Sequence, residues 1–221
     1  MPRLLELFSG TKSMGRAFEK KGWEIISVDI DAKSQPTICC NILDIELDRW
    51  PAHHFDVIHA SPPCTYYSQA RTTGKPVDMR PHDMISLHTV NLINALKPKI
   101  FFIENPAFSR IWHLSWLKDL SWWLNDVSDY KIASYCHYSD WGYQKHTRFA
   151  TNIGDFWKPR RCKNDCPHVF KTSKNFFRHA QCAQRGPSKE FRGNRFSQKQ
   201  LYRIPDHLCD EIANACEAFL E

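Results

Sequence analysis

The segment 3-RLLELFSGTKSMGRAFEKKG-22 determines the fold prediction. Its first part, 3-RLLELF-8, has the apolar character of a buried strand, and 13-SMGRAFEKKG-22 has the pattern of a helix that ends at Gly22. The turn between them, 8-FSGTKSMG-15, is built mainly from small residues. A strand, a short turn and a helix in this order form the first unit of an α/β fold.

The same alternation continues through the first 150 residues or so. Further strands are predicted at 24–30, 55–60, 99–105, 130–138 and 147–152, and further helices at 82–97 and 111–126. Pro98 ends the helix before it. Trp112 and Trp116, four residues apart, are expected to pack on the sheet rather than stack on bases. The chain is therefore predicted to form a mostly parallel, doubly wound, Rossmann-like sheet.

Length and composition limit the class of protein. The chain has 221 residues and a mass of 26.0 kDa, enough for one sizeable core and a small appended lobe. No stretch approaches the roughly 18 apolar residues that a membrane span needs, and the N-terminus lacks a signal-peptide pattern. The nine cysteines are an odd number with no sign of export, so a cytoplasmic protein with reduced thiols is predicted.

The charge is unevenly distributed. Between Trp141 and Arg203 there are fifteen Lys and Arg but three acidic residues, a local balance of +12. Because the whole chain carries +6, the remainder carries 6 − 12 = −6. A basic lobe on an acidic body predicts binding to a polyanion, with nucleic acid favoured over a merely solvated surface.

The predicted strand ends carry reactive and polar side chains. Gly10 and Asp29 follow the first two strands, where a backbone turn and an acid commonly hold a nucleoside-containing cofactor. Cys64 follows two prolines in 61-SPPCTYYS-68, and Glu104 ends the apolar run 100-IFFI-103. Arg148 begins a later strand. A thiol, a carboxyl group and an arginine beside a cofactor site are the components of a reaction centre.

These motifs resemble those of the DNA cytosine-5 methyltransferases, and more narrowly of the short phage-type and prophage-type members. The resemblance rests on 5-LELFSGTKSMG-15, 61-SPPCTYYS-68, 103-IENP-106 and 146-HTRFATN-152, and includes 183-AQRGPS-188 and 203-RIPDHLCDEI-212. It covers nearly the whole chain. The Pro-Pro-Cys and Glu-Asn motifs are its specific part, because many methyltransferases share the glycine motif.

The resemblance implies S-adenosylmethionine as the methyl donor and duplex DNA as the substrate. Cys64 would add to carbon 6 of a flipped-out cytosine, Glu104 would hold the base edge and support protonation of ring nitrogen 3, and Arg148 would contact the base oxygen. The residues expected to bind the cofactor are Phe8, Ser9, Gly10, Thr11, Asp29, Ile30, Asn41, Ile42 and Pro62.

The sequence departs from the family at three positions. Asn41 stands where an aspartate commonly meets the adenine, His146 replaces the first of two arginines, and Pro106 follows Glu-Asn. Two alternatives remain: methylation of cytosine in RNA, and a nucleic-acid-binding protein without turnover. The intact cysteine, glutamate and arginine disfavour the second. Methylation of adenine is rejected because its motif has an aromatic residue in place of Cys64.

Two groups of basic residues are predicted to contact DNA phosphates. The segment 65–81 could close over the DNA through Arg71, Lys75 and Arg80, with a disordered surface loop as the alternative. In the basic lobe, Phe176 and Phe177 could reach bases. The lobe residues expected on phosphates are Lys171, Lys174, Arg178 and Arg185.

The segment 162-CKNDCPHVFKTSKNFFRHAQC-182 could hold zinc. The favoured ligands are Cys162, Cys166, His168 and Cys182, with His179 as the other candidate histidine and unligated thiols as the alternative. The expected organisation is a catalytic domain at 1–152, a basic target-recognition lobe at 153–200 and a C-terminal helix at 201–221 that packs back on the catalytic domain. The lobe is small, and the protein is expected to be a monomer or weak dimer in the cytoplasm of a bacterial or phage-infected cell.

Overall fold

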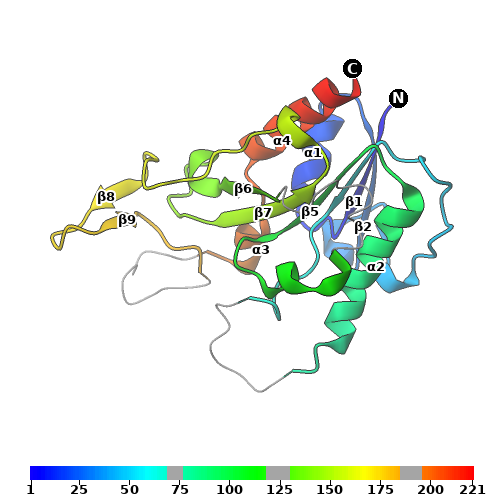
Figure 1. Ribbon diagram of the computed structural model, residues 1–221, viewed down its shortest axis with the longest axis horizontal. Helices are drawn as coiled ribbons and strands as arrows, with labels where there is room; N and C mark the ends of the chain where they lie inside the picture. Colours follow the sequence, from blue (N-terminus) through cyan, green and yellow to red (C-terminus); the bar gives the residue numbers. More distant parts are fainter. Residues whose placement is uncertain (69–76, 118–129, 185–195) are drawn as a thin grey trace.

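The structure is a computed structural model that describes residues 1–68, 77–117, 130–184 and 196–221. Within these residues the chain forms one seven-stranded sheet, helices on both of its faces, and a separate two-stranded hairpin (Figure 1). The sheet order is β3-β2-β1-β4-β5-β7-β6. Its strands are β1 (Arg3–Leu7), β2 (Glu24–Asp29), β3 (Ile38–Cys39), β4 (Val57–Ala60), β5 (Ile100–Pro106), β6 (Tyr130–Ser134) and β7 (His146–Thr151).

Strands β1 to β5 are parallel, and β7 is inserted antiparallel between β5 and β6. The order reverses at β1, since β2 pairs on one side of it and β4 on the other. Ligands of open α/β sheets bind beyond the carboxyl ends of the strands at such a reversal. The prediction of a mostly parallel, doubly wound sheet is confirmed.

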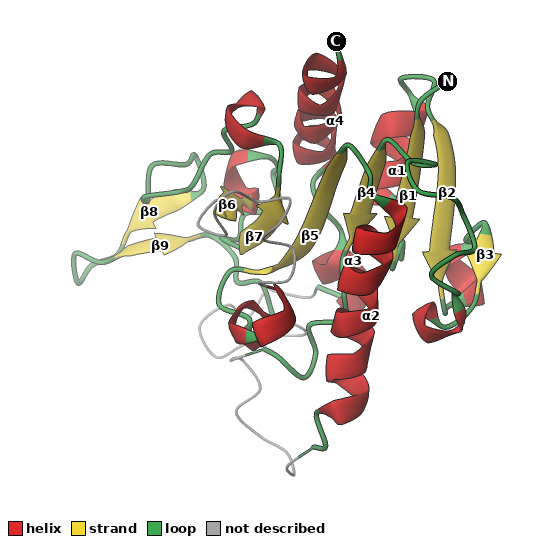
Figure 2. Cartoon of the chain, turned by 45° about the vertical axis from the view of Figure 1, so that its right-hand side comes forward, coloured by secondary structure: helices red, strands yellow, loops and turns green. Residues whose placement is uncertain are grey.

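Two apolar cores cover the two faces of the sheet. Helices α1 (Ser13–Glu19) and α4 (Asp206–Leu220) lie together on one face, where Phe18 and Ile212 are fully buried (Figure 1). Helix α2 (Arg80–Leu96) covers the other face and buries Leu92 and Ile93 (Figure 2). The C-terminal segment, with α3 (Gln198–Tyr202) and α4, thus packs on the sheet domain.

The predicted helix at 111–126 differs from what the structure shows of this segment. Arg110–His113 forms a single 3-10 turn that Ser109 caps by accepting a hydrogen bond from the amide of Ile111. Residues 118–126 lie outside the described part of the chain. Trp112 packs edge-on against Tyr130, with ring centroids 5.4 Å apart, which agrees with the structural role expected for it.

The basic lobe projects from the sheet beyond β6 and β7 (Figures 1 and 2). Its hairpin consists of β8 (Val169–Lys171) and β9 (Phe177–His179), and it leaves Phe170, Phe176 and Phe177 exposed. Among the described residues, no helix is both long and apolar enough to cross a membrane.

Candidate active site

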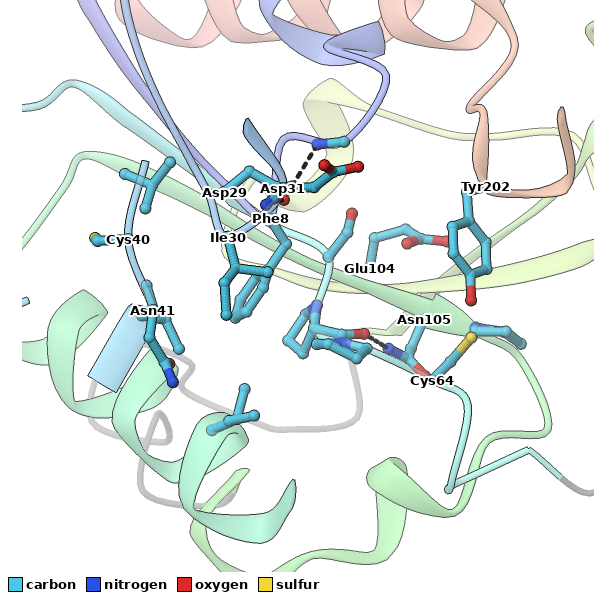
Figure 3. A pocket seen from close by; sticks show the side chains of 18 of the residues that line it. Phe8, Asp29, Ile30, Asp31, Cys40, Asn41, Cys64, Glu104, Asn105 and Tyr202 are labelled. Atoms are coloured by element: carbon cyan, nitrogen blue, oxygen red, sulfur yellow. Dashed lines mark hydrogen bonds between the residues drawn. The ribbon is translucent and has the colours of Figure 1, made fainter. Parts of the chain in front are cut away.

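A pocket of about 360 Å³ opens at the carboxyl ends of the parallel strands (Figure 3). It is lined by the turn after β1, the end of β2, the Pro-Pro-Cys turn after β4 and the Glu-Asn-Pro end of β5. The sequence-predicted residues that the structure brings together here are Phe8, Gly10, Asp29, Ile30, Asn41, Ile42, Pro62, Cys64 and Glu104. Of the other expected cofactor residues, Ser9 and Thr11 line a smaller neighbouring pocket.

Asp29 holds the turn that follows β1. Its Oδ2 accepts a hydrogen bond from the Gly10 amide at 2.7 Å, and its Oδ1 accepts one from the Asp31 amide at 2.8 Å (Figure 3). Gly10 has φ +45° and Phe8 has φ +59°, so the turn runs through the left-handed region twice. Each carboxylate oxygen retains a second lone pair, which leaves Asp29 able to accept hydrogen bonds from ribose hydroxyls.

The helix N-terminus behind this turn is capped from within the protein. Oε1 of Glu6, a buried residue of β1, accepts a hydrogen bond from the Met14 amide at 3.2 Å. Burial raises the pKa of Glu6 to about 7. A Cβ atom on Gly15 would lie 2.6 Å from Glu6 Oε2, so a glycine is required where the helix crosses this carboxyl group. The α1 amide of Met14 thus binds Glu6 rather than a ligand.

The cofactor half of the pocket has the chemistry of a nucleoside site. Ile42 and the exposed Ile30 give it apolar walls, and Asn41 lies at its far end (Figure 3). The Asn41 side chain caps a 3-10 turn by accepting a hydrogen bond from the Leu43 amide at 3.1 Å, and its amide nitrogen is a donor. Apolar walls for a flat base, with an acid for a ribose, fit the adenosine part of S-adenosylmethionine.

The turn that carries Cys64 is fixed by its neighbour on β5. Asn105 is buried and donates from Nδ2 to the carbonyl oxygen of Pro62 at 2.8 Å (Figure 3). The Tyr67 amide donates to the Cys64 carbonyl at 3.0 Å. These bonds, with two prolines of fixed φ, hold the thiol at the pocket wall.

The charges around Cys64 set its reactivity. Burial raises the pKa of the Cys64 thiol and the Glu104 carboxylate raises it further, whereas the Lys145 ammonium lowers it. Burial also raises the pKa of Glu104, opposed first by the charge of Lys145. Lys145 lines the pocket and donates from Nζ to the Leu201 carbonyl at 2.9 Å. The cation beside the thiol and carboxyl groups is therefore Lys145.

Arg148 lies away from the pocket, in contrast to its predicted contact with the base. Arg148 pairs with Asn105 across the β5–β7 ladder, and Glu104 pairs with the next residue of β7, Phe149. Since neighbouring strand residues point to opposite faces, Arg148 and Glu104 lie on different faces of the sheet. Its guanidinium packs over the rings of Trp112 and Tyr130, at 5.5 and 4.9 Å from their centroids.

The residues predicted to contact DNA fall in three places. Arg80 begins α2 at an exposed position and forms an ion pair with Asp78 at 2.7 Å. Lys171 and Arg178 lie on the two strands of the exposed hairpin, and Lys174 lies in its turn. Arg71, Lys75 and Arg185 lie outside the described residues.

Four possible metal ligands converge at the base of the hairpin, but they are not the four predicted. Cys162 and Cys166 lie close together as expected, and the other two members are Cys136 and His179. The predicted ligand His168 instead turns its Nε2 to the Ser139 carbonyl at 2.9 Å. The predicted ligand Cys182 directs its sulfur to the Gln184 side chain at 3.7 Å.

The pocket residues that were not identified from the sequence include Lys145, Asn105 and Tyr202. Lys145 belongs to the motif that contains Arg148, and of these two cations Lys145 is the one found among the pocket residues. Asn105 was quoted only as part of a motif. Tyr202 reaches the pocket from α3, and its hydroxyl lies 3.4 Å from that of Thr65, a contact across the whole chain that no local pattern reveals.

Comparison with known proteins agrees with the geometry. Residues 2–108 match the family model of the C-5 cytosine-specific DNA methylases. The "Probable DNA (cytosine-5)-methyltransferase" of Frog virus 3 (isolate Goorha) is 34% identical over 97% of this chain and 100% of its own length.

A solved structure shows a similar fold. It is described as a "putative DNA modification methyltransferase encoded within prophage" of E. coli and superposes with a TM-score of 0.51 at 15% identity. That match covers 68% of this chain and 46% of the prophage protein, so the chain spans about half of that structure's length. Two features therefore coincide: a pocket that brings the Pro-Pro-Cys thiol and Glu104 together with Gly10 and Asp29, and a relative matched from end to end. The chain belongs to the family of C-5 cytosine-specific DNA methylases.

Proposed function

We propose that this protein transfers a methyl group to carbon 5 of a cytosine in duplex DNA, through a transient covalent bond between Cys64 and carbon 6 of the base. The observation that supports this most is the presence of Cys64 and Glu104 in one pocket with Gly10 and Asp29. A thiol nucleophile and the expected cofactor residues are then within one continuous cavity. Pro62, whose carbonyl is held by Asn105, lines the same cavity.

Different residues of the chain carry out different steps of the proposed reaction. The Cys64 thiolate adds to carbon 6, and the ring electrons move to carbon 5 while Glu104 shares its proton with nitrogen 3. The raised pKa of Glu104 suits this role, because a carboxyl group that holds its proton can donate it to the base. When bound, S-adenosylmethionine supplies the electrophilic methyl group that carbon 5 accepts. Removal of the carbon 5 proton by a base, which we take to be water, re-forms the ring double bond and expels the thiolate.

Lys145 takes the cationic role in this proposal. It lowers the pKa of both Cys64 and Glu104, so it favours the thiolate that must attack. Its position in the pocket also places a positive charge where negative charge develops on the base. Arg148 then serves to brace Trp112 and Tyr130 on the opposite face.

The exposed hairpin supports DNA as the substrate. Lys171, Lys174 and Arg178 lie on it, with Phe176 and Phe177 exposed beside them. Cations with interleaved aromatic rings suit phosphate contacts and base stacking. The target base must leave the duplex to reach Cys64, since the thiol lies inside a pocket.

Methyl transfer from labelled S-adenosylmethionine tests the proposal when compared across duplex DNA, single-stranded DNA and transfer RNA. We expect incorporation into duplex DNA, with 5-methylcytosine as the product, and none with Cys64→Ser. Greater incorporation into transfer RNA would show that the substrate is RNA. Normal activity of Cys64→Ser would show that Cys64 does not form a covalent bond with the base. The absence of any methyl transfer by the folded wild type would indicate a binding protein without turnover.

A further inference from the structure

The base of the hairpin contains a cluster of three sulfur atoms and one ring nitrogen. Cys136, Cys162, Cys166 and His179 are all buried, and one potential ligand atom from each lies within 4.8 Å of the other three. The Nε2 atom of His179 is 3.5 Å from the Cys162 sulfur and 3.2 Å from the Cys166 sulfur. Four soft or borderline ligands around one point are the arrangement of a structural zinc site.

The spacing needs little adjustment for a metal. Zn–S and Zn–N bonds of about 2.3 and 2.1 Å in a tetrahedron give ligand-to-ligand separations of about 3.4 to 3.8 Å. The two S···N distances of 3.5 and 3.2 Å are already near this range. Cys162 and Cys166 approach from one loop, Cys136 from the turn after β6 and His179 from the end of β9.

Among the described residues, the hairpin has little apolar core of its own. A two-stranded hairpin alone is marginal in water, and this one leaves Phe170, Phe176 and Phe177 exposed. The described apolar cluster at its base consists of Cys136, Cys162 and Cys166, with Val169 packed against it. Small lobes of this kind require a metal or disulfides in place of a core, and all three thiols are free.

We propose that one Zn²⁺ ion binds Cys136, Cys162, Cys166 and His179 and fastens the basic hairpin to the end of β6. Three separate parts of the chain meet at the ion, so its loss releases the hairpin while the sheet stays folded. Among the described residues, hydrogen bonds also join the two parts there, such as the Cys162 amide donating to Ser134 Oγ at 2.8 Å and the Ser134 amide donating to the Arg160 carbonyl at 3.0 Å.

The cluster of possible metal ligands is also linked to the pocket through neighbouring residues. Ser134 Oγ, which accepts from the Cys162 amide, is 2.7 Å from Nδ1 of His146 in β7. Tyr135, the neighbour of Cys136, lies under the Lys145 ammonium at 4.7 Å from its ring centroid. The metal site and the pocket therefore share the segment from Ser134 to Cys136.

A second group of potential ligands, His137, Cys162 and Asp165, overlaps with the first. It has three members, one of which is exposed, and His137 is 3.2 Å from Asp165 in what is an ordinary ion pair when the ring is protonated. Closed structural zinc sites have four ligands, which favours the buried set.

The test is the metal content of the full-length protein, purified without chelators or a histidine tag, measured by mass spectrometry of the elements. We expect about one zinc per chain, and a loss of more than about tenfold in Cys136→Ser and in His179→Gln. The matched controls Cys182→Ser and His168→Gln change the same residue types nearby and should keep the metal. Asp165→Asn should also keep it.

Three outcomes would overturn the proposal. They are wild-type protein without zinc, zinc retained by Cys136→Ser but lost from Cys182→Ser, and a disulfide among the three cysteines of the cluster. If Cys136→Ser does not fold, alkylation of the wild type provides the test. In the zinc-loaded protein the thiols of Cys136, Cys162 and Cys166 should resist alkylation. Removal of zinc by a chelator should make them reactive. Equal labelling before and after chelation would contradict the site.

A second measurement follows the consequence of metal loss. Chelation should raise hydrogen exchange in 160–182 and leave β1 and β2 unchanged, with S-adenosylmethionine binding measured by calorimetry also unchanged. Weaker DNA binding after chelation rests on the proposed function, whereas metal content and exchange do not. A metal-bound protein that does not bind DNA would therefore contradict the proposed function and leave the metal site standing.

Discussion

Asn105 and Arg148 lie opposite each other across the antiparallel β5–β7 ladder, on the face of the sheet away from Glu104. The Asn105 side chain holds the Pro62 carbonyl, and the Arg148 guanidinium packs over the rings of Trp112 and Tyr130. Among the described residues, the cation that lines the pocket with Cys64 is Lys145. The predictions for the reaction follow from this difference between two cations of one motif.

Replacing Lys145 by methionine should slow methylation and shift its pH dependence. Lys145 lowers the pKa of Cys64, so its removal raises that pKa and reduces the thiolate fraction at neutral pH. The rising limb of the plot of rate against pH should move to higher pH. At pH values below the pKa of Cys64, the rate should fall about tenfold for each unit by which that pKa rises. Single-turnover rates between pH 6 and 10, measured at saturating cofactor, check this.

Arg148→Met is the matched comparison. It removes a cation three residues away, so it should lower thermal stability through the loss of its contacts with Trp112 and Tyr130 and leave the pH profile in place. A profile that moves in Arg148→Met and stays fixed in Lys145→Met would return the catalytic role to Arg148.

Asp29→Asn should weaken S-adenosylmethionine binding by more than its lost ribose contact alone. The carboxylate also holds the Gly10 and Asp31 amides, and an amide side chain offers one acceptor oxygen in place of two. We expect a loss of about tenfold or more, corresponding to about 1.4 kcal/mol, in calorimetric affinity. Unchanged affinity in the folded variant would exclude Asp29 from the cofactor site.

The buried Glu6 should make stability depend on pH. Its pKa is raised to about 7 from the ordinary value of 4.5, so its contribution to stability is fully present below pH 4.5 and is lost as pH rises through 7. The difference of 7 − 4.5 = 2.5 units corresponds to about 3 kcal/mol.

Glu6→Gln isolates this effect. Burial lowers the pKa of His59 to about 3, which gives stability the opposite trend with pH, so wild type alone is not informative. The wild type should lose stability relative to Glu6→Gln between pH 4.5 and 7 in urea unfolding. A constant difference between the two proteins would mean that Glu6 is ionised in the folded state.

The basic hairpin should determine the salt dependence of DNA binding. Each phosphate contact contributes a slope of about −0.9 to log affinity against log salt, so replacing Lys171, Lys174 and Arg178 by alanine should flatten it by about 2 to 3. The control triple replaces Lys20, Lys21 and Lys99. The first two follow the C-terminal end of α1, Lys99 precedes β5, and none of them lines the pocket. Equal slopes for the two triples would show that the hairpin does not face DNA.

Much of the sheet and one half of the site follow from local patterns. Apolar runs and helix periodicity give the parallel strands, and residues at strand ends such as Asp29, Cys64 and Glu104 must meet because parallel strands end at one edge. The choice between Lys145 and Arg148 depends on tertiary packing, since Arg148 packs on Trp112 and Tyr130 while Lys145 lines the pocket.

The metal ligands show the same limit at longer range. Cys162 and Cys166 are four residues apart and were predicted to lie together. Cys136 lies far upstream, in the segment 130–138 that is predicted to be a strand. Only tertiary packing brings it close to Cys162 and Cys166. The sequence favoured His168 over His179 as a ligand, but in the structure His168 bonds the Ser139 carbonyl and His179 joins the cluster.

Duplex DNA that carries 5-fluorocytosine at a methylated position tests the central claim most directly. Fluorine at carbon 5 does not leave as a proton, so the bond between Cys64 and carbon 6 should persist after methyl transfer. The account predicts a denaturation-resistant complex that requires S-adenosylmethionine, with the DNA attached to the peptide containing Cys64 in mass spectrometry. Attachment to another cysteine, or methylation of normal duplex without any trapped complex, would contradict it.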